Sequence, residues 1–130
     1  MNKYLAKIIA SDQEGLQIIS ACSSGAKVKV SGIKYLASNK VFLLSIERIK
    51  VENENEDKKV NSILRFDFVE KSRSKNINQS DQEAVLELVG IDYLKNNDVY
   101  EINLIFNNNA HIALTTETIE ARLEDQSETK

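Results

Sequence analysis

His111 and Cys22 are the side chains of this sequence most suited to chemistry at neutral pH, and each residue type occurs once. A nucleophilic thiol needs a base and a third group that orients the base, and a zinc site needs several closely spaced ligands. Cys22 falls on the apolar stripe of an expected helix, and His111 falls in a hairpin far along the chain. We therefore expect an inert packed thiol, a surface or partly packed histidine, and no catalytic, cofactor or metal site.

Carboxylates and glycines give no stronger motif. Asp67, Glu87, Asp92 and Glu101 are most simply exposed positions of strands. The four glycines are dispersed along the chain, whereas a phosphate-binding loop needs them clustered. The composition, with 42% hydrophobic and 28% charged residues, is that of an ordinary folded protein.

Basic residues gather in the first half of the chain. Residues 26–50 carry a local charge of +5, whereas the segment from Glu117 to the end carries −3. Alternating basic and acidic blocks usually mean solvated strand faces and a mobile loop, and a surface that recognises a charged partner is the alternative. The candidate interaction surface consists of Lys27, Lys29, Lys34, Lys40, Arg48 and Arg73.

The length of 130 residues suits one domain, which we place at residues 1–125, with a frayed acidic tail at 126–130. The longest apolar run, Val41 to Ile46, is far shorter than the 18 or so residues that a membrane span needs. Lys7 interrupts what would be the apolar part of a signal peptide, and a lone cysteine suits a reducing compartment. These features predict a cytoplasmic protein without a membrane partner.

The N-terminal quarter predicts a strand followed by a helix. Residues 4–10 are short and apolar, which favours a strand. Ser11 and Glu14 have the spacing of a capping box, with serine as N-cap, and Gly25 supplies the left-handed turn that ends a helix. The apolar stripe of this helix consists of Leu16, Ile18, Ile19 and Cys22.

After Gly25 the pattern alternates with period two, which is typical of strands. The expected strands are 27–30, 33–36, 40–46 and 62–69, with Ser62, Leu64, Phe66 and Phe68 on one face of the last. Both faces of 40–46 are apolar, which predicts a central strand whose second side is covered by a helix. Residues 52–59 and 71–76 are polar and are expected to be loops.

The last third contains one ambiguous segment and one clear hairpin. A capping sequence at Ser80 allows a helix to Leu88, but Val85, Val89, Ile91 and Tyr93 fit one face of a strand, and we favour a strand at 84–94. In the hairpin Tyr100, Ile102, Leu104 and Phe106 alternate, 107–109 turns, and Ile112 and Leu114 return inward. Thr116 is then expected to cap a last helix, with Ile119 and Leu123 as its apolar contacts.

This order of elements predicts an α+β fold: a curved antiparallel sheet or incomplete barrel of about seven strands, with an N-terminal and a C-terminal helix. A pleckstrin-homology-like roll is one version of this architecture. It implies nothing about function.

Several blocks of the sequence resemble an uncharacterised alphaproteobacterial family, domain of unknown function 2948. They include Ala10-Ser11-Asp12, residues 28–36, Leu64-Arg65-Phe66 and residues 117–125. The resemblance covers nearly the whole chain and implies a bacterial, cytoplasmic, single-domain protein without an assigned activity. Arg48, Arg73 and the expected 117–125 helix match the family pattern.

Three functions are compatible with these features. The first is a non-enzymatic protein-interaction module with an unknown protein partner, which the missing catalytic motifs and the separate charged blocks favour. The alternative is a small-molecule binder or weak enzyme whose site lies inside the sheet and has a defined pocket with convergent polar groups. Nucleic-acid binding through the lysines is the third, and the acidic pI near 5.3 and the absence of tryptophan argue against it.

Overall fold

The computed structural model of the chain describes residues 5–53 and 56–129, and over these residues it contains one α-helix and ten strands. The elements are β1 (Lys7–Ala10), α1 (Gln13–Ser23), β2 (Lys27–Lys29), β3 (Ile33–Leu36), β4 (Val41–Asn53), β5 (Glu56–Phe66), β6 (Val69–Lys75), β7 (Val85–Asn96), β8 (Val99–Phe106), β9 (His111–Thr116) and β10 (Ala121–Thr129). Two single 3-10 turns, Val30–Gly32 and Ala37–Asn39, flank β3.

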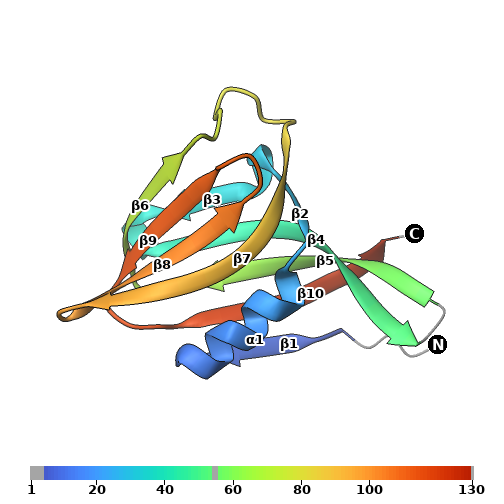
Figure 1. The fold of residues 1–130 in the computed structure, drawn as a ribbon, viewed down its shortest axis with the longest axis horizontal. Coiled ribbons are helices and arrows are strands. Elements are labelled where there is room, and N and C mark those ends of the chain that lie inside the picture. Colours follow the sequence, from blue (N-terminus) through green and yellow to red (C-terminus); the bar gives the residue numbers. More distant parts are fainter. Residues whose placement is uncertain (1–4, 54–55, 130) are drawn as a thin grey trace.

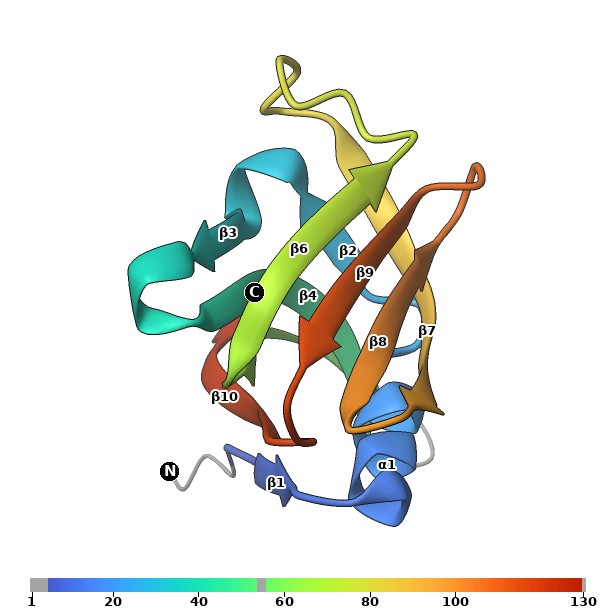
Figure 2. The ribbon, with the colours of Figure 1, turned by 90° about the vertical axis from the view of Figure 1, so that its left-hand side faces the viewer.

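The strands form an open sheet in the order β1-β10-β5-β4-β2-β7-β8-β9-β6, and β3 pairs with β4 beside this path. The pairings are antiparallel. The sheet curls over a central core, so that β6 comes to lie near β3 (Figures 1 and 2). Here the Val69 N–H donates to the Lys40 carbonyl (2.8 Å) and the Tyr35 hydroxyl donates to the Val69 carbonyl (2.9 Å). The expected antiparallel sheet is confirmed, but it has ten strands over the described residues rather than about seven, and it stays open between its end strands β1 and β6.

The core lies inside this curl and includes the buried face of α1. Leu16 and Ile19 of the helix share a cluster of buried residues with Phe42 and Leu44 of β4. The helix packs mainly against β7 and β1 at this core, and the prediction that a helix covers the second side of β4 was wrong. On that second side Leu43 is half-buried and Ser45 is exposed.

The predicted start of the helix was wrong by one residue. Asp12 is the N-cap, and its Oδ1 accepts a hydrogen bond from the Gly15 N–H (2.8 Å). Serine and aspartate are equally good caps, so the sequence alone does not separate Ser11 from Asp12. At the other end Gly25 has a φ of +87°, as the left-handed turn requires. Within the stripe Ile18 is exposed rather than buried.

The C-terminal helix expected at 117–125 was wrong, and β10 takes its place. Ile119, Ala121, Leu123 and Asp125 are buried at every second position, which is the period of a strand. Ile119 and Leu123 are also four residues apart, so their spacing fits a helix equally well. Pairing with β1 on one side and β5 on the other decides in favour of the strand. β10 runs to Thr129, and its residues Ser127, Glu128 and Thr129 pair with β5.

Two segments that were expected to be loops are strands. Most of 52–59 belongs to β4 and β5, whose long hairpin extends beyond the body of the sheet (Figure 1). Residues 71–75 belong to β6, which pairs with β9. The residues of β6 that were expected to form a loop are mostly exposed, which is why their sequence is polar.

The strand 62–69 ends earlier than predicted. Ser62, Leu64 and Phe66 are buried on one face, as expected, but Phe68 is 49% exposed. Phe68 has a φ of +60°, so the chain turns there between β5 and β6. The prediction that Phe68 shares the buried face was therefore wrong.

The strand favoured at 84–94 is confirmed as β7, but its expected face was wrong in part. Leu88 and Ile91 are buried, whereas Val85 and Val89 are exposed. The register shifts between Leu88 and Gly90, so Val89 is the extra residue of a bulge that reverses the alternation. The following hairpin is confirmed, with Asn108 and Asn109 at positive φ in its turn.

Candidate functional site

Lys27 and Lys29 of the candidate interaction surface lie on β2 and point to the exposed side of the sheet. Each pairs with a glutamate from the β7 side of the sheet. Lys27 Nζ lies 2.9 Å from Glu87 Oε1, and Lys29 Nζ lies 3.2 Å from Glu83 Oε1. The positive charge that the sequence concentrates in this region is thus balanced by carboxylates about 55 residues further along.

Lys40 and Arg73 are also paired, in other parts of the surface. Lys40 Nζ lies 2.9 Å from Glu70 Oε2, and their hydrogen bond raises the pKa of Lys40 and lowers the pKa of Glu70. Arg73 of β6 lies 3.4 Å from Glu101 on β8. Lys34 is exposed on β3 without an ion-pair partner among the described residues.

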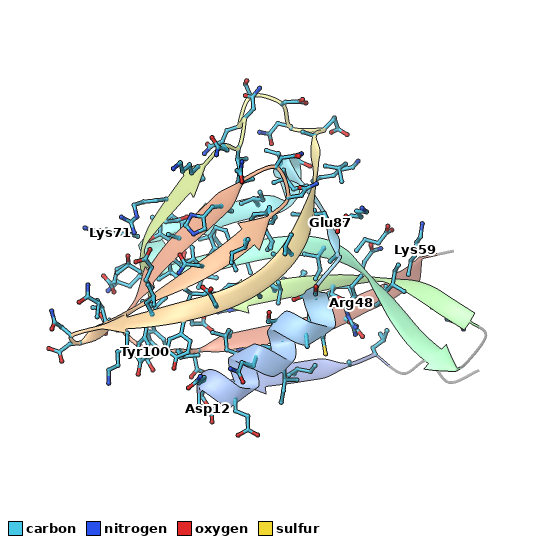
Figure 3. All side chains as sticks on the ribbon, viewed as in Figure 1. Asp12, Arg48, Lys59, Lys71, Glu87 and Tyr100 are labelled. Atoms are coloured by element: carbon cyan, nitrogen blue, oxygen red, sulfur yellow. The ribbon has the colours of Figure 1, made fainter. Side chains whose placement is uncertain are left out.

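Arg48 is not on the surface. Its side chain is 7% exposed and faces Asp125, whose side chain is fully buried (Figure 3). Nε of Arg48 donates to Asp125 Oδ1 (3.1 Å) and Nη2 donates to Oδ2 (2.9 Å), which is a bidentate ion pair. The Ser62 hydroxyl donates to Oδ1 (2.6 Å), and the Ala6 N–H donates to Oδ2 (2.8 Å). The pair thus joins β4, β5, β10 and the segment that leads into β1.

Asp125 stays ionised because its partners outweigh its burial. Burial in the sheet would raise the pKa of the carboxyl. Hydrogen bonds from Ser62, from the Ala6 N–H and from Arg48, together with the positive charge of Arg48, act in the other direction. The net result is a pKa below the ordinary value of 3.8.

A groove of about 680 Å³ crosses the outer face of the sheet. Its lining comes from β7 (Val85), β2 (Lys27, Lys29), β4 (Ser45, Glu47), β5 (Asn61, Ile63) and β10 (Gln126). These are five neighbouring strands in the sheet order. Neighbours of these residues along the strands, such as Leu44 and Leu64, are buried in the core and do not line the groove, so the groove lies on the face opposite the core.

The groove exists because β2 and β4 separate. They pair at Lys27 and Glu47, after which the chain leaves β2 through the 3-10 turn Val30–Gly32. Gly32 lies against Ser45, where a Cβ on Gly32 would come within 3.1 Å of the serine Cβ. At the far end Gln126 is the extra residue of a bulge in β10, between Asp125 and Ser127.

Of the six candidate residues, the groove brings together Lys27 and Lys29. Lys34, Lys40, Arg48 and Arg73 do not line it. The groove has no linear sequence motif, because its lining comes from five strands. The alternation of polar Lys27 and Lys29 with Val28 was the one available signal, and it marks an exposed face without showing its shape.

The residues considered for chemistry lie apart. Cys22 is a half-buried free thiol on α1, and His111 is on β9, where Asn103 Oδ1 accepts a hydrogen bond from its Nε2 (2.8 Å). Within the described ranges, no three His, Cys, Asp or Glu side chains lie close enough to share a metal ion. No helix of the described chain is long and apolar enough to cross a membrane.

The sequence was compared with protein families, curated proteins and solved structures. No curated protein and no solved structure matches it. Residues 6–130 match the family described as "Protein of unknown function (DUF2948)", which is nearly the whole chain. The chain therefore belongs to the DUF2948 family.

Proposed function

We propose that this protein is a non-enzymatic interaction module that holds an extended, uncharged segment of a partner protein in the groove. The observation that carries this proposal is the groove itself, which crosses five strands on the exposed face of the sheet. Its apolar lining residues, such as Ile63 and Val85, are available to side chains of a partner. Val85 is 53% exposed, although valine is a residue that proteins usually bury.

The length of the groove fits a peptide. Five neighbouring strands span four gaps of about 4.8 Å each, or roughly 19 Å. An extended chain advances about 3.3 Å per residue, so about six residues of a partner would cross the groove.

The charges of the groove favour an uncharged segment. Lys27 and Lys29 line it, but they already pair with Glu87 and Glu83, and a further carboxylate, that of Glu47, lies opposite Lys27 on β4. A strongly acidic partner or a nucleic acid would have to compete with these ion pairs. An apolar segment avoids this competition and gains from covering Val85 and Ile63.

The proposal is tested by filling the groove. Heptapeptides are selected from a random library on the immobilised protein, and their dissociation constants are measured by fluorescence titration. Ser45 is exposed on the groove floor, so Ser45→Arg blocks the groove without disturbing the core. Ser80→Arg is the matched control, because Ser80 is an exposed serine outside the groove.

The expected result is selection of apolar peptides whose affinity falls at least tenfold, about 1.4 kcal/mol, with Ser45→Arg. With Ser80→Arg the affinity should not change. Equal affinity for both variants and the wild type would refute the groove as the binding site. Failure to select any peptide of this kind would refute the proposed ligand class.

A further inference from the structure

A second cavity, of about 260 Å³, lies at the open end of the sheet. It is bordered by Ile33, Tyr35 and Phe42 of the β3–β4 hairpin and by Ser72 and Ser74 of β6. The polar loop of residues 76–84, between β6 and β7, lies over this end (Figure 2). The cavity is separate from the groove, since Val30 borders the cavity whereas Ser31 and Gly32 border the groove. The 3-10 turn is thus the wall between them.

The residues that line the cavity carry no charge. Its ten residues all belong to the described part of the chain, and none of them is Asp, Glu, Lys, Arg or His. One side offers apolar groups from Ile33, Phe42 and Ile112, and the other offers the hydroxyl of Ser72 and the amide of Gln82. An ion would lose its hydration there without gaining an opposite charge. The lining therefore suits an uncharged molecule with one apolar and one hydrogen-bonding end.

The size of the cavity sets the size of the ligand. A protein cavity of about 150 Å³ is enough to hold a benzene ring. The present cavity exceeds this by roughly 110 Å³, which leaves space for a short polar substituent. Larger molecules, such as nucleotides, need the several hundred Å³ of an ordinary cofactor pocket.

Hydrogen bonds connect both ends of the loop over the cavity to the rest of the protein. Asn76 Nδ2 donates to the Asn109 carbonyl (2.8 Å), and the Ser31 N–H donates to the Gln82 carbonyl (3.0 Å). Between these points the hydrogen bond from Gln79 Nε2 to Ser74 Oγ (3.0 Å) connects the loop to β6. Asn78 bonds within the loop, to Ser80. Ile77 packs against the core and Gln82 Nε2 donates to the Gln79 carbonyl, so a ligand would enter where the exposed hydrogen bond between Gln79 and Ser74 opens.

We propose that the cavity under the 76–84 loop binds a small neutral molecule made of one ring and a hydroxyl or amide substituent. The ring packs against Ile33, Phe42 and Ile112, and the substituent bonds with Ser72 or Gln82. This site is independent of the peptide groove, so either proposal can fail without the other.

The test uses three probes that share a ring and differ in charge: benzyl alcohol, benzoate and benzylammonium. Each is titrated into the ¹⁵N-labelled full chain, and amide chemical shifts are followed. Benzyl alcohol should give saturable shifts at Val30, Ile33, Ile77 and Ile112, with an affinity at least about fivefold higher than that of either charged probe. Shifts that do not saturate, shifts centred on the groove, or equal affinities for the three probes would overturn the proposal.

A cavity-filling variant separates the site from non-specific binding. Ser72→Phe places a ring inside the cavity and should weaken benzyl alcohol binding at least tenfold. Ser38→Phe, at an exposed serine outside the cavity, is the control and should leave binding unchanged. Ile33→Phe fills the cavity from the opposite wall and replaces Ser72→Phe if the circular dichroism spectrum shows that the latter does not fold. Unchanged binding in a folded cavity-filling variant would refute the site.

Discussion

Arg48 and Asp125 place two opposite charges where the sheet otherwise buries apolar residues. Removing two ions from water costs several kcal/mol for each, and good geometry with further hydrogen bonds is needed to offset this cost. Both conditions are met, because the contact is bidentate and Ser62 and the Ala6 N–H satisfy the remaining oxygen positions. The ion pair is therefore a buried link between β4 and β10 rather than a surface charge, and the Ala6 N–H connects the N-terminal segment to it.

Removing one partner should be much more costly than removing both. Arg48→Met leaves Asp125 buried without its counter-charge, so the free energy of unfolding should fall by about 3–5 kcal/mol in urea titrations. The double variant Arg48→Met, Asp125→Leu should recover most of this loss. Arg73→Met is the control, because it removes an exposed ion pair worth less than about 1 kcal/mol. Equal losses for Arg48→Met and Arg73→Met would contradict the role of the buried pair.

The pH dependence of stability should carry the signature of Asp125. Its folded pKa lies below the ordinary value of 3.8, so the unfolded chain binds a proton first as the pH falls. The stabilisation is complete well above pH 3.8 and is lost as the pH falls from there through the folded pKa. The difference in unfolding free energy between wild type and Asp125→Asn should be constant from pH 7 to about pH 5 and shrink below pH 4. A difference that stays the same down to about pH 3 would exclude this linkage.

For single residues, the sequence shows which side chains carry a charge, but it does not show which side chain each of them contacts. Arginine is rarely buried, so placing Arg48 at the surface was the natural expectation. Its partner Asp125 lies 77 residues away, and no local pattern connects them. The pairing follows from strand register, which places Arg48, Ser62 and Asp125 on neighbouring strands.

At the scale of elements, Gly25 ends α1 in a conformation that other residues rarely adopt, with a φ of +87°. A Cβ there would meet nothing within 4 Å, so the cost of a side chain is conformational rather than steric crowding by neighbours. Gly25→Ala should lower the unfolding free energy by about 1–2 kcal/mol in urea. Gly25→Asn should lose less, because asparagine tolerates positive φ. An alanine variant as stable as the wild type would show that this turn does not need glycine.

Strands in which apolar and polar residues alternate clearly were predictable from the sequence. Segments whose apolar spacing fits both a helix and a strand were not. Residues 100–106 alternate without ambiguity and form β8 as expected. Ile119 and Leu123 satisfy both a helix and a strand, and tertiary pairing decided between them. A bulge such as that at Val89 also exchanges the buried and exposed sides of a strand, and the alternating pattern of the sequence does not show where this happens.

At the scale of the whole molecule, several lysines of the curled sheet form ion pairs with glutamates. Lys27, Lys29 and Lys40 each face a glutamate that is distant in sequence. The groove is likewise a product of the assembled sheet, because β2 and β4 diverge after a single shared pair. Neither the neutralised surface nor the groove was visible from the sequence, which shows only the basic and acidic blocks.

Peptide binding in the groove should depend weakly on salt. Between about 0.1 M and 1 M salt the Debye length falls from about 10 Å to 3 Å, yet the dissociation constant should change less than about threefold. A ligand held by several phosphate contacts would instead lose about a thousandfold or more in affinity over a smaller range of salt. Fluorescence titration at the two salt concentrations distinguishes these cases. A steep salt dependence would show that the ligand is held by the charges of Lys27 and Lys29 and would contradict an uncharged segment.

The most direct test of the proposed function is an amide chemical-shift map of the ¹⁵N-labelled protein with a selected apolar heptapeptide. The proposal predicts saturable shifts in residues 27–32, 45–47 and 61–63, which line or adjoin the groove. Residues that do not line the groove, such as Arg73 and Leu94, should not respond. Shifts centred away from these three segments would contradict the assignment of the groove as the partner-binding site.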